Sequence, residues 1–513
     1  MTAQPAAAPQ RREFTKRLNW VDGLSLGLSI PVGGFALIGY SIGILGAWTA
    51  MLLWGITCVI AIAQNFIFAE LAAMFPNKPG GIALYAHEGW RRYFTPIGAV
   101  AAVGYWAGWS FGLAVYGLII GQLLAAQFFP HSAWTVFDGT QHIGIAVFLA
   151  GAAIVAVWAL NVFGIRPAVT ANKLIGVVVL VTIAILLAGP FVTGHWHDRL
   201  TWGLGHPGQA WGGWQLAIVY LYVMCWTAYG TEIAATFSPE NRDQRRDTPR
   251  ALLSGGLLTL AFLVLGPLAT TGVVGEKEIT AQPVGFFIPV FSSIIGPAAS
   301  VLTIVICGAL FINMTAATAD AGRALYGIAR DGMIVRQLFH LNKQHMPARA
   351  MTLDLVVNLC LVFFVANTLG ILFASNLGYM IAIVFALTGF LLLRRDRPAW
   401  PRPIKLGRAW LAVAAGLIIF NLVLIVVGAL NPATAGYGGT TDQLVGLAIL
   451  AIALVMFVFR RLVQDRAPLR FREVTPRLPE ELSADQAFME GVAPPGMTRA
   501  DAETPVSADG MPS

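Results

Sequence analysis

The segment SIPVGGFALIG, residues 29–39, decides how the chain is built, because it places helix breakers in the middle of an apolar run. The run extends over residues 21–45, and about twenty apolar residues are enough to cross the hydrocarbon core of a bilayer as a helix. Pro31 lacks a backbone N–H, and Gly33 and Gly34 weaken a helix. In lipid, every backbone polar group needs a partner. The segment therefore predicts a transmembrane helix whose interruption faces protein or a polar cavity.

The composition is that of a polytopic membrane protein. Of the 513 residues, 57% are hydrophobic and 12% are charged, so there are too few charged side chains to cover a soluble chain of this length. Apolar stretches of spanning length recur along most of the chain. We predict an all-α protein with twelve transmembrane helices, at residues 21–45, 48–74, 95–127, 142–164, 170–193, 213–236, 249–273, 288–322, 351–369, 371–394, 409–430 and 442–462.

Lysine and arginine gather on one side of these predicted spans. The N-terminal segment at residues 1–20 and the loops after the even-numbered spans carry most of them, whereas the opposite side receives Arg199 and Lys277. Because cytosolic loops are enriched in Lys and Arg, we expect both termini in the cytosol and the protein in the cytoplasmic membrane. Residues 463–513, rich in Pro, Asp and Glu, are expected to form a mostly disordered cytosolic tail. The net charge of +7 follows from this placement and requires no nucleic-acid partner.

A second interruption occurs in the sixth predicted span, in the segment CWTAYGTEIAA at residues 225–235. Gly230 lies at mid-membrane, close to Glu232, whose carboxylate is costly at that depth unless it faces a cavity or a partner. A simple proline kink would explain the first span alone. If the first ten spans form two five-helix repeats, however, spans one and six hold corresponding places, and such a pair indicates the midplane binding site of a transporter.

The two interruptions suit a zwitterion or a cation. Free N–H groups on the half-helix that begins near Gly33 favour a carboxylate, and adjacent glycines let that group approach the backbone. Carbonyl oxygens between Thr227 and Gly230 can accept hydrogen bonds from an ammonium group. Glu232 either carries charge directly or has a structural role, in which it bonds to backbone N–H groups of the broken first span.

Several segments, in order, resemble those of the amino acid–polyamine–organocation permeases. VGGFA at residues 32–36 occupies the place of the family's glycine-rich motif, and WTAYGTE at 226–232 that of its aromatic-x-x-x-Gly-x-Glu segment. GGIALY at 80–85 and RALYGIARDG at 323–332 are similar to the family's loop and cytosolic-end motifs. The resemblance, which runs over residues 20–397, implies a LeuT-like fold. Its parts would be two inverted five-helix repeats, at 21–193 and 213–394, and two added helices, at 409–462.

The resemblance also implies alternating-access transport of an amino acid or a related amine, with roles for individual residues. Trp226 would be the aromatic gate over the substrate. First-span residues would receive the substrate carboxylate, and backbone carbonyls of the sixth span its ammonium. Gly33 stands where the family usually has serine, which removes a hydroxyl donor and leaves Ser29 as the nearby hydroxyl. The substrate-binding residues predicted in this way are Ser29, Val32, Gly33, Gly34, Trp226, Thr227, Tyr229 and Gly230.

Glu232 and Asp320 are the carboxyl groups predicted to take part in gating or coupling. Asp320 lies in the eighth predicted span, and Arg323, three residues on along the same helix face, is its alternative ion-pair partner. The coupling ion expected is H⁺ or Na⁺. Thr315 and Thr318 are candidate Na⁺ ligands, although threonine hydroxyls in membrane helices commonly bond to their own backbone.

A secondary transporter of an amino acid is the leading interpretation, and a transporter of a small amine or polyamine, working as a symporter or exchanger, is the alternative. A channel would need a repeated pore-lining element, and a transporter-like sensor would share the features above. We do not expect an enzyme, because the sequence offers no nucleophile–base pair, phosphate loop or redox motif. We likewise predict no cofactor and no metal site. The expected partners are the substrate, a coupling ion and membrane lipid.

Overall fold

The computed structural model describes residues 18–27, 29–76, 78–129, 131–132, 134–136, 143–163, 165–203, 213–296, 299–365, 368–435, 440–475 and 487. The α-helices are α1 (Trp20–Gly27), α2 (Ser29–Val32), α3 (Gly34–Leu45), α4 (Ala47–Met74), α5 (Gly81–Trp90), α6 (Ile97–Ser110), α7 (Gly112–Phe128), α8 (Ile145–Val162), α9 (Ile165–Val192), α10 (Trp214–Ala228), α11 (Ile233–Thr236), α12 (Gln244–Val274), α13 (Glu276–Ala281), α14 (Phe287–Ile295), α15 (Ala299–Arg330), α16 (Ala348–Cys360), α17 (Thr368–Asp396), α18 (Ala409–Leu430) and α19 (Thr440–Phe459).

Shorter elements join these helices. Strands β1 (Thr135–Val136) and β2 (Ile143–Gly144) pair in antiparallel fashion. The remaining elements are the 3-10 turns Tyr229–Glu232, Ser238–Glu240, Arg336–Leu338 and Pro432–Ala435, and the π-helical turns Leu361–Val365 and Arg460–Gln464.

The chain is a multi-pass membrane protein. Within the described residues, ten helices are long and apolar enough to cross a membrane, and two shorter apolar helices, Gly34–Leu45 and Gly176–Val192, lie in the first and fifth predicted spans. A helix thus lies at each of the twelve predicted positions. Predicted spans nine and ten are separate helices, α16 and α17. The all-α polytopic class predicted from hydropathy is confirmed.

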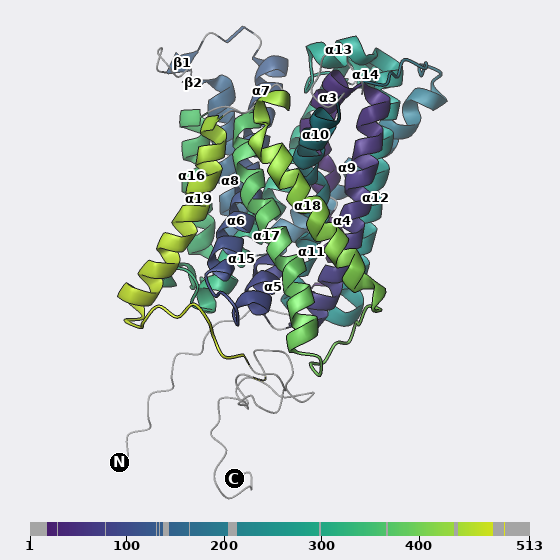
Figure 1. Cartoon of the computed structure of the whole chain (residues 1–513). Coiled ribbons are helices and arrows are strands. Elements are labelled where there is room, and N and C mark those ends of the chain that lie inside the picture. Colours follow the sequence, from purple (N-terminus) through teal and green to yellow (C-terminus); the bar gives the residue numbers. More distant parts are fainter. Residues whose placement is uncertain are drawn as a thin grey trace, which may run out of the picture.

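The long helices run side by side in one bundle (Figure 1). The short helices α13 and α14 and the strands β1 and β2 lie toward one end of it, and α5 toward the other (Figure 1). Within the bundle α4 packs along α12, and α6 along α17. A Cβ added at Gly104 of α6 would lie 2.5 Å from the carbonyl oxygen of Gly378 in α17. The bare glycine backbone therefore permits the close approach of these two helices.

Among the ten long helices within the described residues, the sixth predicted span is the most buried, and the last two helices lie at the periphery. Of the most apolar stretch of Trp214–Thr236, 89% is buried inside the protein, compared with 28% for Ala409–Leu430 and 28% for Gln443–Gln464. An apolar helix that keeps most of its surface uncovered suits contact with lipid chains. A span buried almost throughout has its polar residues facing other helices, so the sixth span is placed where a binding site can form.

Both interruptions lie inside the bundle. The first span is divided into α1, α2 and α3, and α2 contacts α10, α12 and α15. The sixth span tightens from α10 into the 3-10 turn Tyr229–Glu232 before α11. This placement agrees with the expectation that a broken membrane helix faces protein, because lipid offers no partner for freed backbone groups.

Candidate functional site

A cavity lies where the two interrupted spans meet α6, α7, α15 and α17. Its free volume is about 20 Å³, which is room for about one water molecule, so the cavity has to widen before it can hold a substrate. Aromatic rings form much of its wall, and hydroxyl and amide groups supply a few polar positions. The lining residues are Ile30, Gly108, Trp109, Gly112, Tyr116, Trp226, Thr227, Gly230, Asn313, Ala317 and Tyr379.

The interruption of the first span is a tight turn. Gly33 has right-handed backbone angles, φ −56° and ψ −26°, and its N–H donates to the carbonyl oxygen of Ile30 at 2.9 Å. A Cβ added at Gly33 would lie 2.7 Å from Tyr116 Oη and 3.0 Å from Thr227 Cγ2. Because Tyr116 and Thr227 both line the cavity, the bare face of Gly33 lies directly behind the cavity wall.

Gly34, the adjacent glycine, faces another helix. A Cβ there would lie 2.5 Å from Leu263 Cδ2 and 2.9 Å from Phe262 Cε1, both in α12. Val32 is buried in the hydrophobic core and is not among the lining residues. The Ser29 side chain lies outside the described residues. Of the predicted carboxylate-binding group, Gly33 therefore lies directly behind the cavity wall and Gly34 faces α12, and neither is among the lining residues.

Trp226 and Thr227 of the sixth span line the cavity. The indole Nε1 of Trp226 donates to the carbonyl oxygen of Gly108 at 3.0 Å, and its ring packs against Tyr116 with centroids 5.5 Å apart. The Trp226 ring is thus held across the cavity toward α6 and α7. The Thr227 hydroxyl is buried and has no hydrogen-bond partner among the residues that the structure describes.

Gly230 and Tyr229, both in the 3-10 turn, face different parts of the protein. A Cβ at Gly230 would lie 3.1 Å from Ile30 Cδ1 and 3.3 Å from Trp109 Cη2, so this glycine lets the wall close. Tyr229 instead donates from its hydroxyl to Asn421 Oδ1 of α18 at 3.0 Å, away from the cavity lining. Its backbone N–H donates to the carbonyl oxygens of Cys225 and Thr227, so the Thr227 carbonyl already has a partner.

Glu232 lies behind the aromatic wall. Its Oε1 accepts from Tyr379 Oη at 2.6 Å and from Trp109 Nε1 at 3.2 Å, and both partners line the cavity. Its Oε2 has no hydrogen-bond partner in the described parts of the chain. The partners shown for the carboxyl are thus side chains of α6 and α17, rather than the first-span N–H groups expected from the sequence. Through these two bonds Glu232 fixes two rings of the cavity wall.

Asp320 lies on α15 and is fully buried. Thr236 and Tyr105 face its carboxyl group, although neither of its oxygens has a hydrogen-bond partner within the described residues. Arg323, the partner considered from the sequence, forms a buried ion pair with Glu240 at 2.5 Å. Asp320 is not among the lining residues and lies in a polar layer behind the cavity.

Sequence reasoning missed several residues of the site. Tyr116, Asn313 and Tyr379 line the cavity, but nothing in their local sequence distinguishes them from other polar residues in apolar helices. Asp354 and Asn358 are different, because an ionisable residue and an amide one helical turn apart in an apolar run form a polar face. Both are fully buried on α16.

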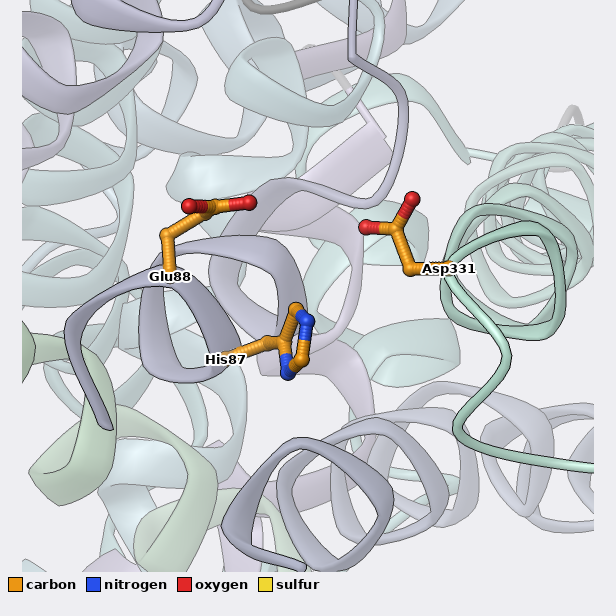
Figure 2. Close-up of side chains that lie close together, drawn as sticks. All are labelled: His87, Glu88 and Asp331. Carbon is orange, nitrogen blue, oxygen red and sulfur yellow. The ribbon is translucent and has the colours of Figure 1, made fainter. Parts of the chain in front are cut away.

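His87 and Glu88 of α5 and Asp331, which directly follows α15, form a separate cluster of side chains (Figure 2). One ligand-type atom from each lies within 4.8 Å of the others, a spacing that a metal ion could bridge. Glu88, however, forms ion pairs with Lys78 at 2.7 Å, with Arg91 at 3.1 Å and with Arg397 at 3.0 Å. A metal ion would meet these three positive side chains, so the geometry favours an ion-pair network.

The ionisation of this cluster follows from its surroundings. Burial opposes the charged form of Glu88, but Arg91, Lys78 and Arg397 outweigh it and hold the pKa of that carboxyl well below its usual range. Burial lowers the pKa of the His87 imidazole. The cluster thus combines a charged carboxylate with a neutral imidazole at neutral pH.

Comparison with known proteins finds transporters. The family model described as amino acid permease matches residues 18–458. The amino-acid permease RocE of Bacillus subtilis is 26% identical over 346 residues, which cover 65% of this chain and 70% of that protein. A putative arginine/ornithine antiporter of Escherichia coli is 24% identical over 463 residues, covering 86% and 92%. An uncharacterized transporter of Mycobacterium tuberculosis is 24% identical over 470 residues, covering 89% and 93%.

Proposed function

Since the chain belongs to the amino acid permease family, we propose that it is a secondary active transporter that carries an amino acid across the cytoplasmic membrane by alternating access. The observation that carries the proposal is the cavity at which the two interrupted spans meet. A substrate held there lies at the point where two broken helices can change their packing. Transporters of this architecture place their substrate at such a junction.

The cavity wall supports recognition of a small zwitterion. Gly33 has no side chain and lies directly behind the cavity wall formed by Tyr116 and Thr227. The unpaired Thr227 hydroxyl offers a hydrogen bond to a polar substrate group. Trp226 and Tyr116 supply apolar area for the rest of the substrate. Trp226 acts as the gate, because its bond to the Gly108 carbonyl oxygen closes the cavity and can break when the helices separate.

The substrate class proposed first is a cationic amino acid. Two of the relatives are named an amino-acid permease and a putative arginine/ornithine antiporter, and Glu232 keeps one unpaired carboxyl oxygen next to the rings of Trp109 and Tyr379. An unpaired carboxyl oxygen close to the cavity can accept a hydrogen bond from the second amino group of such a substrate. The same observation favours a small amine or polyamine as the second candidate, carried by symport or exchange.

The proposal includes an orientation and an internal symmetry. The excess of Lys and Arg in the loops after even-numbered spans supports cytosolic termini. The corresponding positions of the two interruptions support two inverted five-helix repeats, at residues 21–193 and 213–394, followed by two added helices. Coupling to H⁺ or Na⁺ would pass through buried carboxyl groups such as Glu232 and Asp320.

The experiment is uptake into proteoliposomes that contain the purified full chain. Radiolabelled L-arginine, L-ornithine, L-alanine and putrescine are compared, each with an H⁺ gradient, a Na⁺ gradient or an internal pool of unlabelled substrate. We expect saturable uptake of at least one amino acid, and uptake of putrescine alone would select the amine alternative. Binding without uptake would indicate a sensor, non-saturable flux would indicate a channel, and either result would contradict the proposal.

A further inference from the structure

Asp354 carries a buried carboxyl group that does not line the cavity and has no role in the proposed function. It lies on α16, is fully buried, and α16 packs against α7, α8 and α15. A carboxylate enclosed between membrane helices is expensive unless it is paired or neutral. The presence of a carboxyl group at this depth therefore needs a chemical explanation.

The surroundings of Asp354 are polar and incompletely bonded. The side chains of Ser110, Trp106 and Thr318 face its carboxyl group. Both carboxyl oxygens of Asp354, the indole Nε1 of Trp106 and the hydroxyl of Thr318 have no hydrogen-bond partner among the described residues. Trp106 is 8% exposed and Thr318 is fully buried. Two helices, α6 and α15, thus direct three donor groups at one carboxyl.

The charged and titratable groups near Asp354 come from few elements. On α15, Asp320 and Arg323 follow Thr318, and Arg323 is ion-paired with Glu240. Tyr105 of α6 faces Asp320. On α16 itself Arg349 is exposed, and α8 contains no titratable residue. On α7, Tyr116 belongs to the cavity wall. Within the part of the chain that the structure describes, no cation forms an ion pair with Asp354.

We propose that Asp354 is a proton-binding site of the transport cycle, which takes up a proton in one conformation and releases it in another. The inference rests on the proposed function and names its coupling ion. The donor set favours a proton over Na⁺, because an indole N–H can only donate and cannot ligate a metal cation. Two hydroxyls that donate or accept can serve the carboxylic acid and the carboxylate alike.

Two of the side chains around Asp354 directly follow cavity-lining residues in the sequence. Ser110 follows Trp109 in α6, and Thr318 follows Ala317 in α15, and both preceding residues line the cavity. Asn358, one turn after Asp354, donates to Ser110 Oγ at 2.9 Å and accepts from the backbone N–H of Ala114 at 3.0 Å. A substrate that moves the α6–α7 junction therefore changes the donors available to Asp354, which couples substrate and proton.

The first test needs only protons as the probe. Infrared spectra of the purified full chain are recorded over a pH titration for wild type, Asp354→Asn and the control Asp198→Asn, which changes an exposed loop carboxylate. We expect wild type and Asp198→Asn to show the carbonyl band of buried protonated carboxyl groups, and Asp354→Asn to lose the part of that band that Asp354 contributes. Identical bands in all three proteins would overturn the proposal. Asparagine keeps the shape of the side chain and one acceptor oxygen, so we expect the variant to fold.

The second test measures coupling. Proteoliposomes that contain a pH-sensitive dye report proton movement on addition of L-arginine, L-ornithine or L-alanine. We expect wild type and Asp198→Asn to move protons with substrate, and Asp354→Asn to lose proton movement and gradient-driven accumulation while it keeps substrate exchange. Proton movement retained by Asp354→Asn, or uptake driven by Na⁺, would overturn the inference and leave the transporter standing. Failure of wild type to transport any amino acid or amine would instead defeat the proposed function.

Discussion

The two adjacent glycines of the first span should respond in different ways to the same substitution. In Gly33→Ala the new methyl group lies 2.7 Å from Tyr116 Oη and 3.0 Å from Thr227 Cγ2. Ordinary contacts between such atoms are about 3.5 Å or longer, so the Tyr116 ring must shift by roughly 1 Å, and the free direction is into the cavity. We expect apparent substrate affinity to fall at least about tenfold, or about 1.4 kcal/mol.

Stability should change little in Gly33→Ala and more in Gly34→Ala. Alanine favours a helix over glycine by about 1 kcal/mol, which offsets part of an overpacking cost of about 1–3 kcal/mol. In Gly34→Ala the methyl group lies 2.5 Å from Leu263 Cδ2 and 2.9 Å from Phe262 Cε1, so the strain falls on the packing of α12. We expect a lower melting temperature with substrate affinity within about twofold of wild type.

The assay pairs substrate-induced thermal shift with uptake for wild type and both variants. The substrate is the amino acid that wild type accumulates in the transport screen. Each glycine serves as the control for the other, because the two substitutions are identical and adjacent. Wild-type affinity in Gly33→Ala, or loss of affinity in a stable Gly34→Ala protein, would refute the assignment of Gly33 to the cavity wall.

Three further outcomes are expected. Trp226→Ala should weaken apparent affinity or uncouple transport, with Trp226→Phe milder, because the indole ring and its bond to Gly108 close the cavity; uptake kinetics test this. Glu232→Gln should impair transport in a folded protein, since the amide changes the hydrogen bond with Tyr379 and removes a group that can bind and release a proton; uptake and size-exclusion chromatography test this. Acidification from about pH 8 to about pH 5 should lower the melting temperature less in His87→Gln than in wild type.

The sign of the His87 effect follows from its lowered pKa. The unfolded state binds a proton at a higher pH than the folded state, so stability is lost as the pH falls below the ordinary imidazole value. Glu88, whose pKa is held below its usual range, contributes stability that is present at neutral pH and is lost progressively as the pH falls from the ordinary carboxyl pKa to the lowered pKa of the folded state. Equal melting curves against pH for wild type and His87→Gln would contradict this reasoning. Equal kinetics for the two Trp226 variants, or normal uptake by Glu232→Gln, would reduce those residues to packing roles.

The general architecture could be predicted from the sequence, because hydropathy and helix breakers act over short stretches. The run at residues 21–45 and the pair Pro31 and Gly33 were sufficient to predict an interrupted first span that faces protein. Local sequence could not separate Gly33 from Gly34, because the direction of each bare face depends on how the turn packs against α7 and α12.

The surroundings of the buried carboxyl groups could not be predicted, because they come from distant parts of the chain. Glu232 accepts hydrogen bonds from Trp109 and Tyr379, each separated from it by more than one hundred residues of sequence. Asp354 carried a local signal, an acidic residue in an apolar run, but its partners on α6 and α15 become visible only in the folded bundle.

The most direct test of the central claim is whether a transported substrate occupies the space beside Thr227. In a Thr227→Cys variant, the rate of modification by a small thiol reagent is followed residue by residue with mass spectrometry, with and without the amino acid that wild type transports. Cys360, exposed on α16, is the internal control. The account predicts that substrate slows modification at position 227 several-fold and leaves Cys360 unchanged. Equal modification at position 227 with and without a saturating transported substrate would contradict the account.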